Sequence, residues 1–304
     1  MTPPPAGWRI LGGANYKSAR REPVNPQRAL REWLALADAI TAAGGEISVL
    51  PPPAPPALLT GLLYTANAGW LVAEGRFRLA RLSVPHRQAE APHLRAALRP
   101  TGWRIEVSQS IWEGQADMCW LSPQAVLLSY GVRSVKESVD EVRAALPAGV
   151  TAHAARLREP FFHGDTCMDV IDAEPGPLWL ACPAAFATRE EYVAARAFAE
   201  RSAIVIEVSE ADALAYACNS LSLGKRLLAP LGLSAALLAA LAQRSVEVQA
   251  LDFGELFGKG GGGPRCLVNE LRGLSRAPAG TAYAEKRAAL VAAVETYPAV
   301  ASER

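Results

Sequence analysis

Chemically active residue types gather in four short segments of this 304-residue chain, and the last of them carries a cysteine. Cys266 follows the glycine run at residues 260–263 and stands beside Arg265. Glycine lets a backbone approach a ligand closely, and a neighbouring positive charge favours the thiolate form of a cysteine. Cys266 is therefore a candidate nucleophile, although an incidental cysteine beside a flexible loop explains the local sequence equally well. The run lacks the Gly-x-x-x-x-Gly-Lys-Ser/Thr pattern of a phosphate loop, which disfavours nucleotide binding.

The other three segments carry a histidine, acids and an asparagine. His163 is followed two residues later by Asp165, an arrangement that can orient a histidine and tune its pKa. Glu113 and Asp117 lie four residues apart in a glycine-containing turn, and Asn67 precedes a predicted hairpin. Each has an ordinary alternative when taken alone: a satisfied core histidine, a solvated acidic loop and a common turn residue.

The composition excludes several classes of protein. The 31 Lys and Arg residues balance 30 Asp and Glu residues without a basic stripe, which argues against a nucleic-acid partner. No apolar run reaches the length of a membrane helix, and the proline-rich N-terminus lacks the apolar core of a signal peptide. The five cysteines are odd in number and form no CxxC pair, so neither a disulfide framework nor a structural zinc site is expected. We therefore expect a soluble, cytoplasmic protein with no membrane partner.

The elements that must position the candidate residues form a repeating pattern. An amphipathic stretch, a turn signal and a short apolar run occur five times, at intervals of roughly 40 to 60 residues. The predicted helices cover residues 26–43, 86–98, 135–146, 189–199 and 234–242. The predicted strands that follow them cover residues 47–50, 103–107, 150–154, 204–208 and 246–248.

Further strand candidates lie between these units. Residues 69–82 predict a hairpin that turns at Gly75, and residues 125–130 and 178–182 are two more apolar runs. The repeated unit is therefore strand–strand–helix–strand. No linker rich in Gly or Ser interrupts the chain, so the sequence predicts one α/β domain over residues 1–304, built of five pseudo-repeats.

Together, these segments resemble the guanidino-group-modifying enzymes of the pentein fold, which include arginine deiminases, dimethylargininases, amidinotransferases and arginine dihydrolases. The motifs occur in the family's order across nearly the whole chain: an Asp/Asn segment at 64–69, Glu-Gly-x-x-Asp at 113–117, His-x-Asp at 163–165 and a Gly-rich segment with its cysteine at 260–266. The resemblance implies an α/β fold of five ββαβ units, arranged like propeller blades around a central active site.

The resemblance also assigns a role to each residue. Cys266 would attack the central guanidinium carbon and form a covalent thiouronium intermediate, and His163 would be the general acid/base. Glu113 and Asp165 would hold the guanidinium nitrogens, whereas Asp117 would be structural. Carboxylates suit a planar cation whose nitrogens are all donors, and a bound cation also favours the thiolate. No metal or organic cofactor is implied.

Asn67 stands where arginine deiminases carry an Asp, and it looks like the Asn of arginine dihydrolases. Asn25, followed by Pro26, looks like the second Asn of that subgroup. A neutral amide both donates and accepts, so Asn67 could hold an uncharged ureido product for a second attack. The alternative is a lost acidic grip, with a different guanidine substrate or a weak enzyme. Arg87 and Arg133 are placed like the family's carboxylate-binding arginines; if they are not merely surface residues, the substrate is a free α-amino acid.

The sequence thus predicts a cysteine-dependent hydrolase of a guanidino substrate, with free L-arginine as the favoured substrate. An arginine dihydrolase that produces ornithine, carbon dioxide and ammonia is the favoured member. Dimethylargininase, arginine deiminase and amidinotransferase remain alternatives. A non-catalytic pentein that binds a partner is a more remote one, because such proteins lack the Cys/His/acid set. Whether the chain forms a homo-oligomer stays open.

Overall fold

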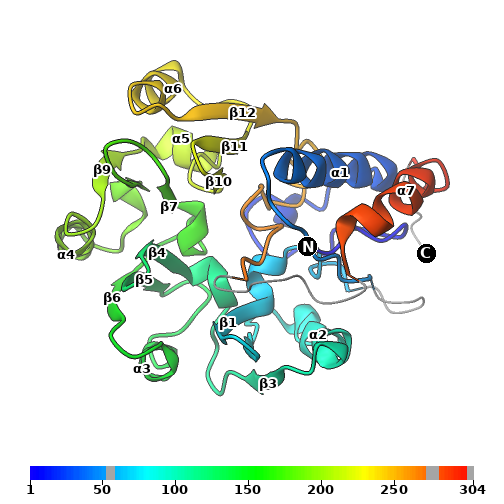
Figure 1. The fold of residues 1–304 in the computed structure, drawn as a ribbon, viewed down its shortest axis with the longest axis horizontal. Coiled ribbons are helices and arrows are strands. Elements are labelled where there is room, and N and C mark those ends of the chain that lie inside the picture. The colour runs from blue at the N-terminus through cyan, green and yellow to red at the C-terminus, as the bar shows by residue number, and fades with distance from the viewer. Residues whose placement is uncertain (53–58, 272–280, 300–304) are drawn as a thin grey trace.

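The structure is a computed structural model that describes residues 1–52, 59–271 and 281–299. Within these ranges, four three-stranded sheets stand around a common centre, and helices cover their outer side (Figure 1). The helices α1 (Pro26–Ala42) and α7 (Tyr283–Val294) occupy the remaining sector of the ring (Figure 1). Among the residues that the structure describes, no helix combines the length and the apolar character needed to cross a bilayer.

All four sheets have the same topology: an antiparallel hairpin whose second strand pairs in parallel with a third strand. The strands, sheet by sheet, are β1 (Gly69–Ala73), β2 (Arg76–Leu79) and β3 (Arg104–Val107); β4 (Met118–Ser122), β5 (Ala125–Tyr130) and β6 (Thr151–Arg156); β7 (Met168–Ile171), β8 (Leu178–Ala181) and β9 (Ile204–Glu207); β10 (Leu221–Leu223), β11 (Arg226–Pro230) and β12 (Glu247–Leu251). Four predicted ββαβ units are therefore confirmed.

Each parallel pair needs a crossover connection, and a helix supplies it. The crossover helices are α2 (Glu90–Leu98), α3 (Ser138–Ala145), α4 (Arg189–Ala199) and α6 (Ala235–Ala242), and a short helix α5 (Glu210–Leu214) precedes the fourth sheet. Thr188 and Ser234 cap α4 and α6 by accepting a backbone N–H of the first turn, which satisfies a donor that has no partner within the helix. The predicted helices at 86–98 and 135–146 begin three to four residues late, since Pro85–Arg87 forms a separate 3-10 turn and α3 starts only at Ser138.

The fifth unit closes the ring with both ends of the chain, and here one prediction is wrong. Residues 47–50 were expected to be a strand, but the described backbone forms only an isolated antiparallel bridge between Ser48 and Ala282. Prolines follow directly at residues 51–53, and a proline has no N–H with which to continue a ladder. Helix packing holds this unit instead, with the Trp33 and Tyr283 rings edge to face at 5.9 Å.

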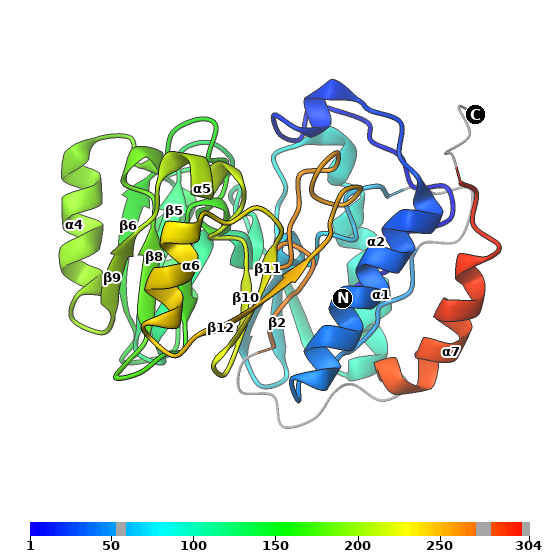
Figure 2. The same cartoon turned by 90° about the horizontal axis from the view of Figure 1, so that it is seen from above.

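The blades also share the turn that leads into them. A 3-10 turn precedes the first strand of three sheets: Thr65–Ala68 before β1, Gly114–Asp117 before β4 and Gly164–Thr166 before β7. These turns contact one another near the centre of the ring. In the view from above, the segment before α1 lies on one face of the ring of sheets (Figure 2). The centre is thus built from equivalent points of successive repeats, each of which can contribute a side chain.

Candidate active site

The three central turns and the glycine run bring the predicted catalytic residues together. Asn67 lies within the first turn, Glu113 directly before the second, and His163 and Asp165 at the start of the third. Cys266 joins them through its carbonyl oxygen, which accepts the backbone N–H of Ala66 at 3.1 Å. These five predicted residues are between 0 and 6 % exposed. The site is therefore shielded from bulk water.

Cys266 lies between an acid and an amide. Its Sγ donates to Asp165 Oδ2 at 3.4 Å and accepts from Asn219 Nδ2 at 3.1 Å. Burial, together with the negative charge of Asp165, raises the pKa of the Cys266 thiol well above its ordinary value. Burial likewise raises the pKa of Asp165 to about 6. The thiol is therefore protonated in the unliganded site, and ionisation needs a cation to offset the local negative charge.

Asn219 is a site residue that the sequence did not indicate. Its Oδ1 accepts the backbone N–H of Cys266 at 3.2 Å, and its Nδ2 also donates to the carbonyl oxygen of Asp165 at 2.9 Å. It stands two residues before β10, as Asn67 stands two residues before β1. That shared position in the repeat is the signal that could have found it.

His163 and Glu113 form a buried pair. His163 Nε2 lies 2.7 Å from Glu113 Oε2, while the backbone N–H and the hydroxyl of Ser83 donate to Oε1 at 2.8 and 2.6 Å. Arg133 Nη1 lies 3.4 Å from Oε2. The Nδ1 atom of His163 has no partner among the described residues. With Nε2 held by the carboxylate, Nδ1 is the ring nitrogen available to exchange a proton with a ligand.

The electrostatics favour an ionised pair. Burial alone would raise the pKa of Glu113, but the hydrogen bond and charge of His163 and the charge of Arg133 hold it below its usual range. Burial alone would lower the pKa of His163, but the charge of Asp117 and the contact with Glu113 raise it. These shifts favour the imidazolium–carboxylate form of the pair, in which a proton is ready for a leaving group.

Asp117 holds the backbone on both sides of the His163–Glu113 pair through buried hydrogen bonds. Its two oxygens accept the hydroxyls of Ser129 and Ser134 at 2.5 and 2.6 Å, and Oδ1 also accepts the backbone N–H of Gly164 at 3.0 Å. Ser134 Oγ in turn accepts the backbone N–H of Glu113 at 2.9 Å. Asp117 thus ties the turn that carries His163 to the turn that carries Glu113.

Arg87, expected to bind a substrate carboxylate, is largely engaged by the protein. Its guanidinium donates to both oxygens of Glu90, to the carbonyl of Gly61 and to Asn67 Oδ1, all at 2.8 to 2.9 Å. Four of its five N–H groups are used in this way. One N–H on Nη1 is left for a ligand, so Arg87 cannot grip a carboxylate through two parallel hydrogen bonds in this arrangement.

Part of this set surrounds a small cavity, the front cavity, of about 50 Å³. Asn67, Arg87, His163 and Cys266 line it together with Arg133, whose guanidinium also lies 5.5 Å from the centre of the Phe162 ring. The segment before α1 lines it too, through residues 8–12, 14, 15 and 18. Arg133 thus lines this cavity, and its role in binding a substrate carboxylate stays a prediction.

Asn25 is the predicted site residue that the structure does not bring to the front cavity. Its side-chain oxygen accepts the backbone N–H of Arg28 at 2.9 Å and caps α1, with Pro26 at the first helical position. Asn15 lines the cavity instead, and its Nδ2 donates to the carbonyl of Gly260 at 3.1 Å. The expectation for Asn25 is corrected accordingly: its amide oxygen is committed to the helix end.

The glycine run before Cys266 is required by packing against side chains. A Cβ at Gly260 or Gly262 would overlap the ring or the hydroxyl of Tyr64. Gly261 has φ +82°, a conformation that other residues rarely adopt, and its carbonyl accepts the Tyr216 hydroxyl at 2.9 Å. The run thus places the nucleophile by close contact with aromatic residues.

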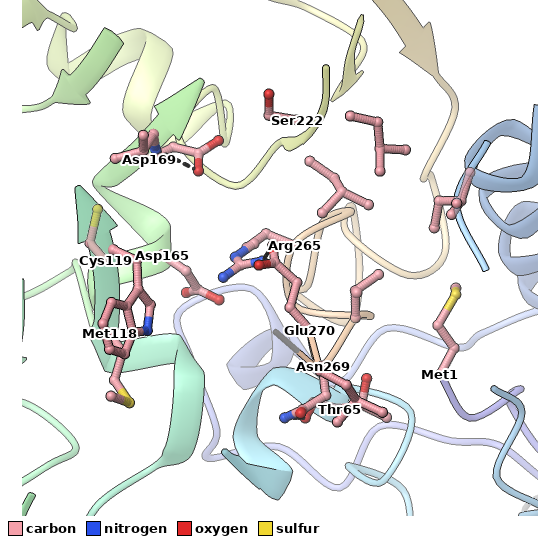
Figure 3. A pocket seen from close by; sticks show the side chains of 18 of the residues that line it. Met1, Thr65, Met118, Cys119, Asp165, Asp169, Ser222, Arg265, Asn269 and Glu270 are labelled. Atoms are coloured by element: carbon pink, nitrogen blue, oxygen red, sulfur yellow. Dashed lines mark hydrogen bonds and ion pairs between the residues drawn. The ribbon is translucent and has the colours of Figure 1, made fainter. Parts of the chain in front are cut away.

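Arg265 does not direct its charge to the cysteine sulfur. Its guanidinium pairs with Glu270 and faces a second, larger space, the central cavity, of about 940 Å³ (Figure 3). Asp165 also lines this cavity, and its Oδ1 has no partner among the described residues. Consecutive residues therefore face opposite sides: Arg265 lines the central cavity and Cys266 the front cavity. The wall between the two cavities is one residue thick at this point.

The structure describes no metal centre: within residues 1–52, 59–271 and 281–299, no three His, Cys, Asp or Glu side chains are grouped to hold a metal ion. A buried cysteine between an acid and an amide, beside a His–Glu pair at the centre of ββαβ units, defines the class of guanidino-group-modifying enzymes of the pentein fold.

Comparison with known proteins agrees. The family model of N,N dimethylarginine dimethylhydrolase, eukaryotic, matches residues 14–273, and the chain belongs to this family. An uncharacterized protein of Caenorhabditis elegans, ZK1307.1, is 27 % identical over 250 residues, which cover 82 % of this chain and 85 % of that protein. The family and the structural neighbours below are hydrolytic guanidino-modifying enzymes.

Solved structures confirm the fold class. The N-terminal domain of ArgZ, an arginine dihydrolase from the ornithine–ammonia cycle in Cyanobacteria, bound to product, has a TM-score of 0.76 at 24 % identity and covers 88 % of this chain and 94 % of that chain. A variant of that domain, covalently bound to a reaction intermediate, has a TM-score of 0.77. A dimethylarginine dimethylaminohydrolase adduct has a TM-score of 0.63 at 18 % identity, covering 80 % of this chain and 91 % of that chain.

Proposed function

We propose that residues 1–304 form one catalytic domain that hydrolyses free L-arginine to ornithine, carbon dioxide and ammonia, as an arginine dihydrolase. The observation that carries the catalytic part is the arrangement of Cys266 against Asp165, with the His163–Glu113 pair beside it. Asn67, a neutral amide that lines the front cavity together with Cys266 and His163, is the reason for proposing a double hydrolysis. Neither a metal nor an organic cofactor takes part in the proposed chemistry.

The first half-reaction begins with a bound guanidinium cation. Asp165 accepts guanidinium N–H groups, and the added positive charge offsets the burial that keeps the Cys266 thiol neutral. The Cys266 thiol then releases its proton to solvent, and the resulting thiolate attacks the central carbon and forms a C–S bond. As the C–N bond breaks, the leaving ammonia takes a proton from the imidazolium of His163. The product is a covalent S-alkylthiouronium on Cys266.

Hydrolysis of this intermediate uses the same residues in reverse. His163, now neutral, removes a proton from water, which attacks the carbon and releases the thiolate. The resulting ureido group is uncharged, and Asn67 holds it in place for a second attack by Cys266. That attack releases a second ammonia, and a second water breaks the new C–S bond. The carbamate so formed loses carbon dioxide and leaves ornithine.

The amino-acid end of the substrate would lie toward the segment before α1. Arg133 and Arg87 line the front cavity, and both are cations suited to an α-carboxylate. Arg87 would contribute its one remaining N–H. Asn15 lies at the same opening and offers an amide. Asn25 is no longer part of this proposal.

A dimethylargininase is the second candidate, and the description of the matching family favours it. The same residues would release dimethylamine in place of ammonia and stop at citrulline. An arginine deiminase would also stop at citrulline, and an amidinotransferase would pass the amidino group to an amine. A binding protein without activity has no reason to keep a cysteine, an acid and a His–Glu pair in one buried site.

The test is incubation of the purified protein with L-arginine while citrulline, ornithine and ammonia are quantified together. Ornithine with two ammonia per arginine is the expected result. Citrulline with one ammonia would make the protein a deiminase. No turnover of arginine, with citrulline formed from asymmetric dimethylarginine, would establish the dimethylargininase.

A further inference from the structure

We propose that Glu90 is a positioning residue that acts through Arg87 to fix the orientation of the Asn67 amide, and that this orientation selects the uncharged ureido intermediate for the second hydrolysis. The inference rests on the proposed function, because it concerns the step that separates a dihydrolase from a deiminase. The hydrogen bonds that the Glu90 carboxylate accepts come from Arg87, so its effect on the amide is expected to pass through that residue.

Glu90 is the first residue of α2 and is only 2 % exposed. Its Oε1 accepts Arg87 Nε at 2.8 Å, and its Oε2 accepts Arg87 Nη2 at 2.9 Å. Two parallel charge-assisted hydrogen bonds fix both the place and the plane of a guanidinium. Burial raises the pKa of Glu90, while the charge of Arg87 opposes that change. The pair is thus a rigid support beneath the front cavity.

Arg87 transmits this constraint to Asn67. Its Nη1 lies 2.9 Å from Asn67 Oδ1. A guanidinium has donors and no acceptor, so the amide atom that faces it must be the oxygen. The amide nitrogen then lies on the other side, where it donates to the carbonyl of Glu113 at 3.4 Å. The orientation of the Asn67 amide is therefore determined by its partner.

The consequence is chemical selectivity. With its oxygen engaged by Arg87 and one N–H engaged by the carbonyl of Glu113, Asn67 has one amide N–H left to donate to a ligand in the front cavity. A guanidinium presents only N–H groups and cannot accept a hydrogen bond from this amino group. A ureido group presents a carbonyl oxygen, which can. An amide held in this orientation therefore retains the product of the first hydrolysis better than it binds the starting cation.

Without the carboxylate of Glu90, Arg87 would be a buried cation that has lost its ion-pair partner. The negative charge of Glu113, which already acts on Arg87, would then attract its guanidinium. If the guanidinium of Arg87 turns away from Asn67, the side-chain oxygen of Asn67 loses its donor. The Asn67 amide is then able to rotate. The ureido intermediate would lose its donor and leave as citrulline before the second attack.

The test is the product ratio of Glu90→Gln, a change that keeps the shape and removes the charge. Loss of a charge-assisted hydrogen bond corresponds to roughly a tenfold change in an equilibrium. We therefore expect the fraction of turnovers that release citrulline to rise about tenfold. Glu106→Gln is the matched control, because Glu106 forms ion pairs with Arg76, Arg78 and Arg104 on strands β2 and β3 and does not line the front cavity. It should keep the product ratio of the unmodified protein.

A double-mutant cycle separates positioning from a general structural effect. If Glu90 acts through Asn67, then Glu90→Gln should leave the product ratio of an Asn67→Asp protein unchanged. An equal effect in both backgrounds would overturn the inference, as would a Glu90→Gln protein that releases no additional citrulline. Citrulline as the sole product of the unmodified protein would overturn the proposed function and this inference together. Ornithine from all single variants in equal proportion would overturn the inference alone.

Discussion

Removal of the Asn219 side chain should impair the nucleophile without touching the substrate. In Asn219→Ala, the cysteine sulfur loses the amide donor that lies 3.1 Å away. A hydrogen bond to a charged partner contributes about 1.5–3 kcal/mol. If that amount stabilises the reactive thiolate, kcat/KM should fall by about 10- to 100-fold.

The same substitution should also cost stability. Asn219 makes two further buried hydrogen bonds, from the backbone N–H of Cys266 at 3.2 Å and to the carbonyl of Asp165 at 2.9 Å. Each bond contributes about 1 kcal/mol, and truncation leaves both backbone groups buried without partners. We expect the free energy of unfolding to fall by about 2–4 kcal/mol in urea titrations.

The decisive measurement is the pH dependence of iodoacetamide alkylation at Cys266, with the modified residue located by mass spectrometry. Burial raises the pKa of this thiol and the Asn219 amide lowers it, so the alkylation curve of Asn219→Ala should move to higher pH. Asn25→Ala is the matched control: it removes a helix cap at a cost of about 1 kcal/mol but leaves the thiol contacts intact. A folded Asn219→Ala protein whose alkylation curve overlays that of the unmodified protein would refute this reasoning.

Three further outcomes are expected. Cys266→Ser and His163→Ala should each abolish turnover while circular dichroism shows a folded protein; normal turnover in either would rule out the proposed mechanism. The pKa of His163 is raised because its carboxylate neighbours outweigh burial, so the stability of its ion pair is complete below about pH 6.5 and is lost as the pH rises through the raised value. Urea midpoints that do not decrease as the pH rises above the pKa of His163 would contradict the predicted loss of stability. Gly262→Ala should destabilise the protein by about 1–3 kcal/mol, because the new methyl group overlaps the Tyr64 ring; an unchanged urea midpoint would show that the ring can move aside.

Local periodicity predicted most of the secondary structure because the spacing of apolar residues within each element shows whether it is a helix or a strand. The helix at 189–199 and the strand at 125–130 have the predicted bounds, since a cap residue, turn signals and an apolar face all agree there. The apolar run at 47–50 met the same local criteria but found only one bridging residue, Ala282, from the distant end of the chain. Pairing with a partner more than 200 residues away is invisible to a local pattern.

The candidate site shows the same division between local and distant information. Asn25 followed by Pro26 matched a motif, but Asn before Pro is equally typical of a helix start, and the structure uses it in that way. Asn15 lies outside the repeats, whereas Asn219 shares with Asn67 its place two residues before the first strand of a repeat. The contacts of these two residues with Gly260 and Cys266 form only in the closed ring. The partner of Arg87, by contrast, is only three residues ahead at Glu90, so an i,i+3 pair on a helix start could have been recognised.

The thin wall between the two cavities has a pharmacological consequence. A compound seated in the central cavity would contact Asp165 and Arg265 directly behind the nucleophile while leaving the front cavity open. Because Asp165 also holds the guanidinium in the proposed mechanism, such a compound would weaken substrate binding through that carboxylate as well as lower kcat. The central cavity is also lined by bulky apolar side chains such as Trp103 and Trp120, which take no part in recognising a guanidine. Such a compound could therefore discriminate between enzymes that share the same front cavity.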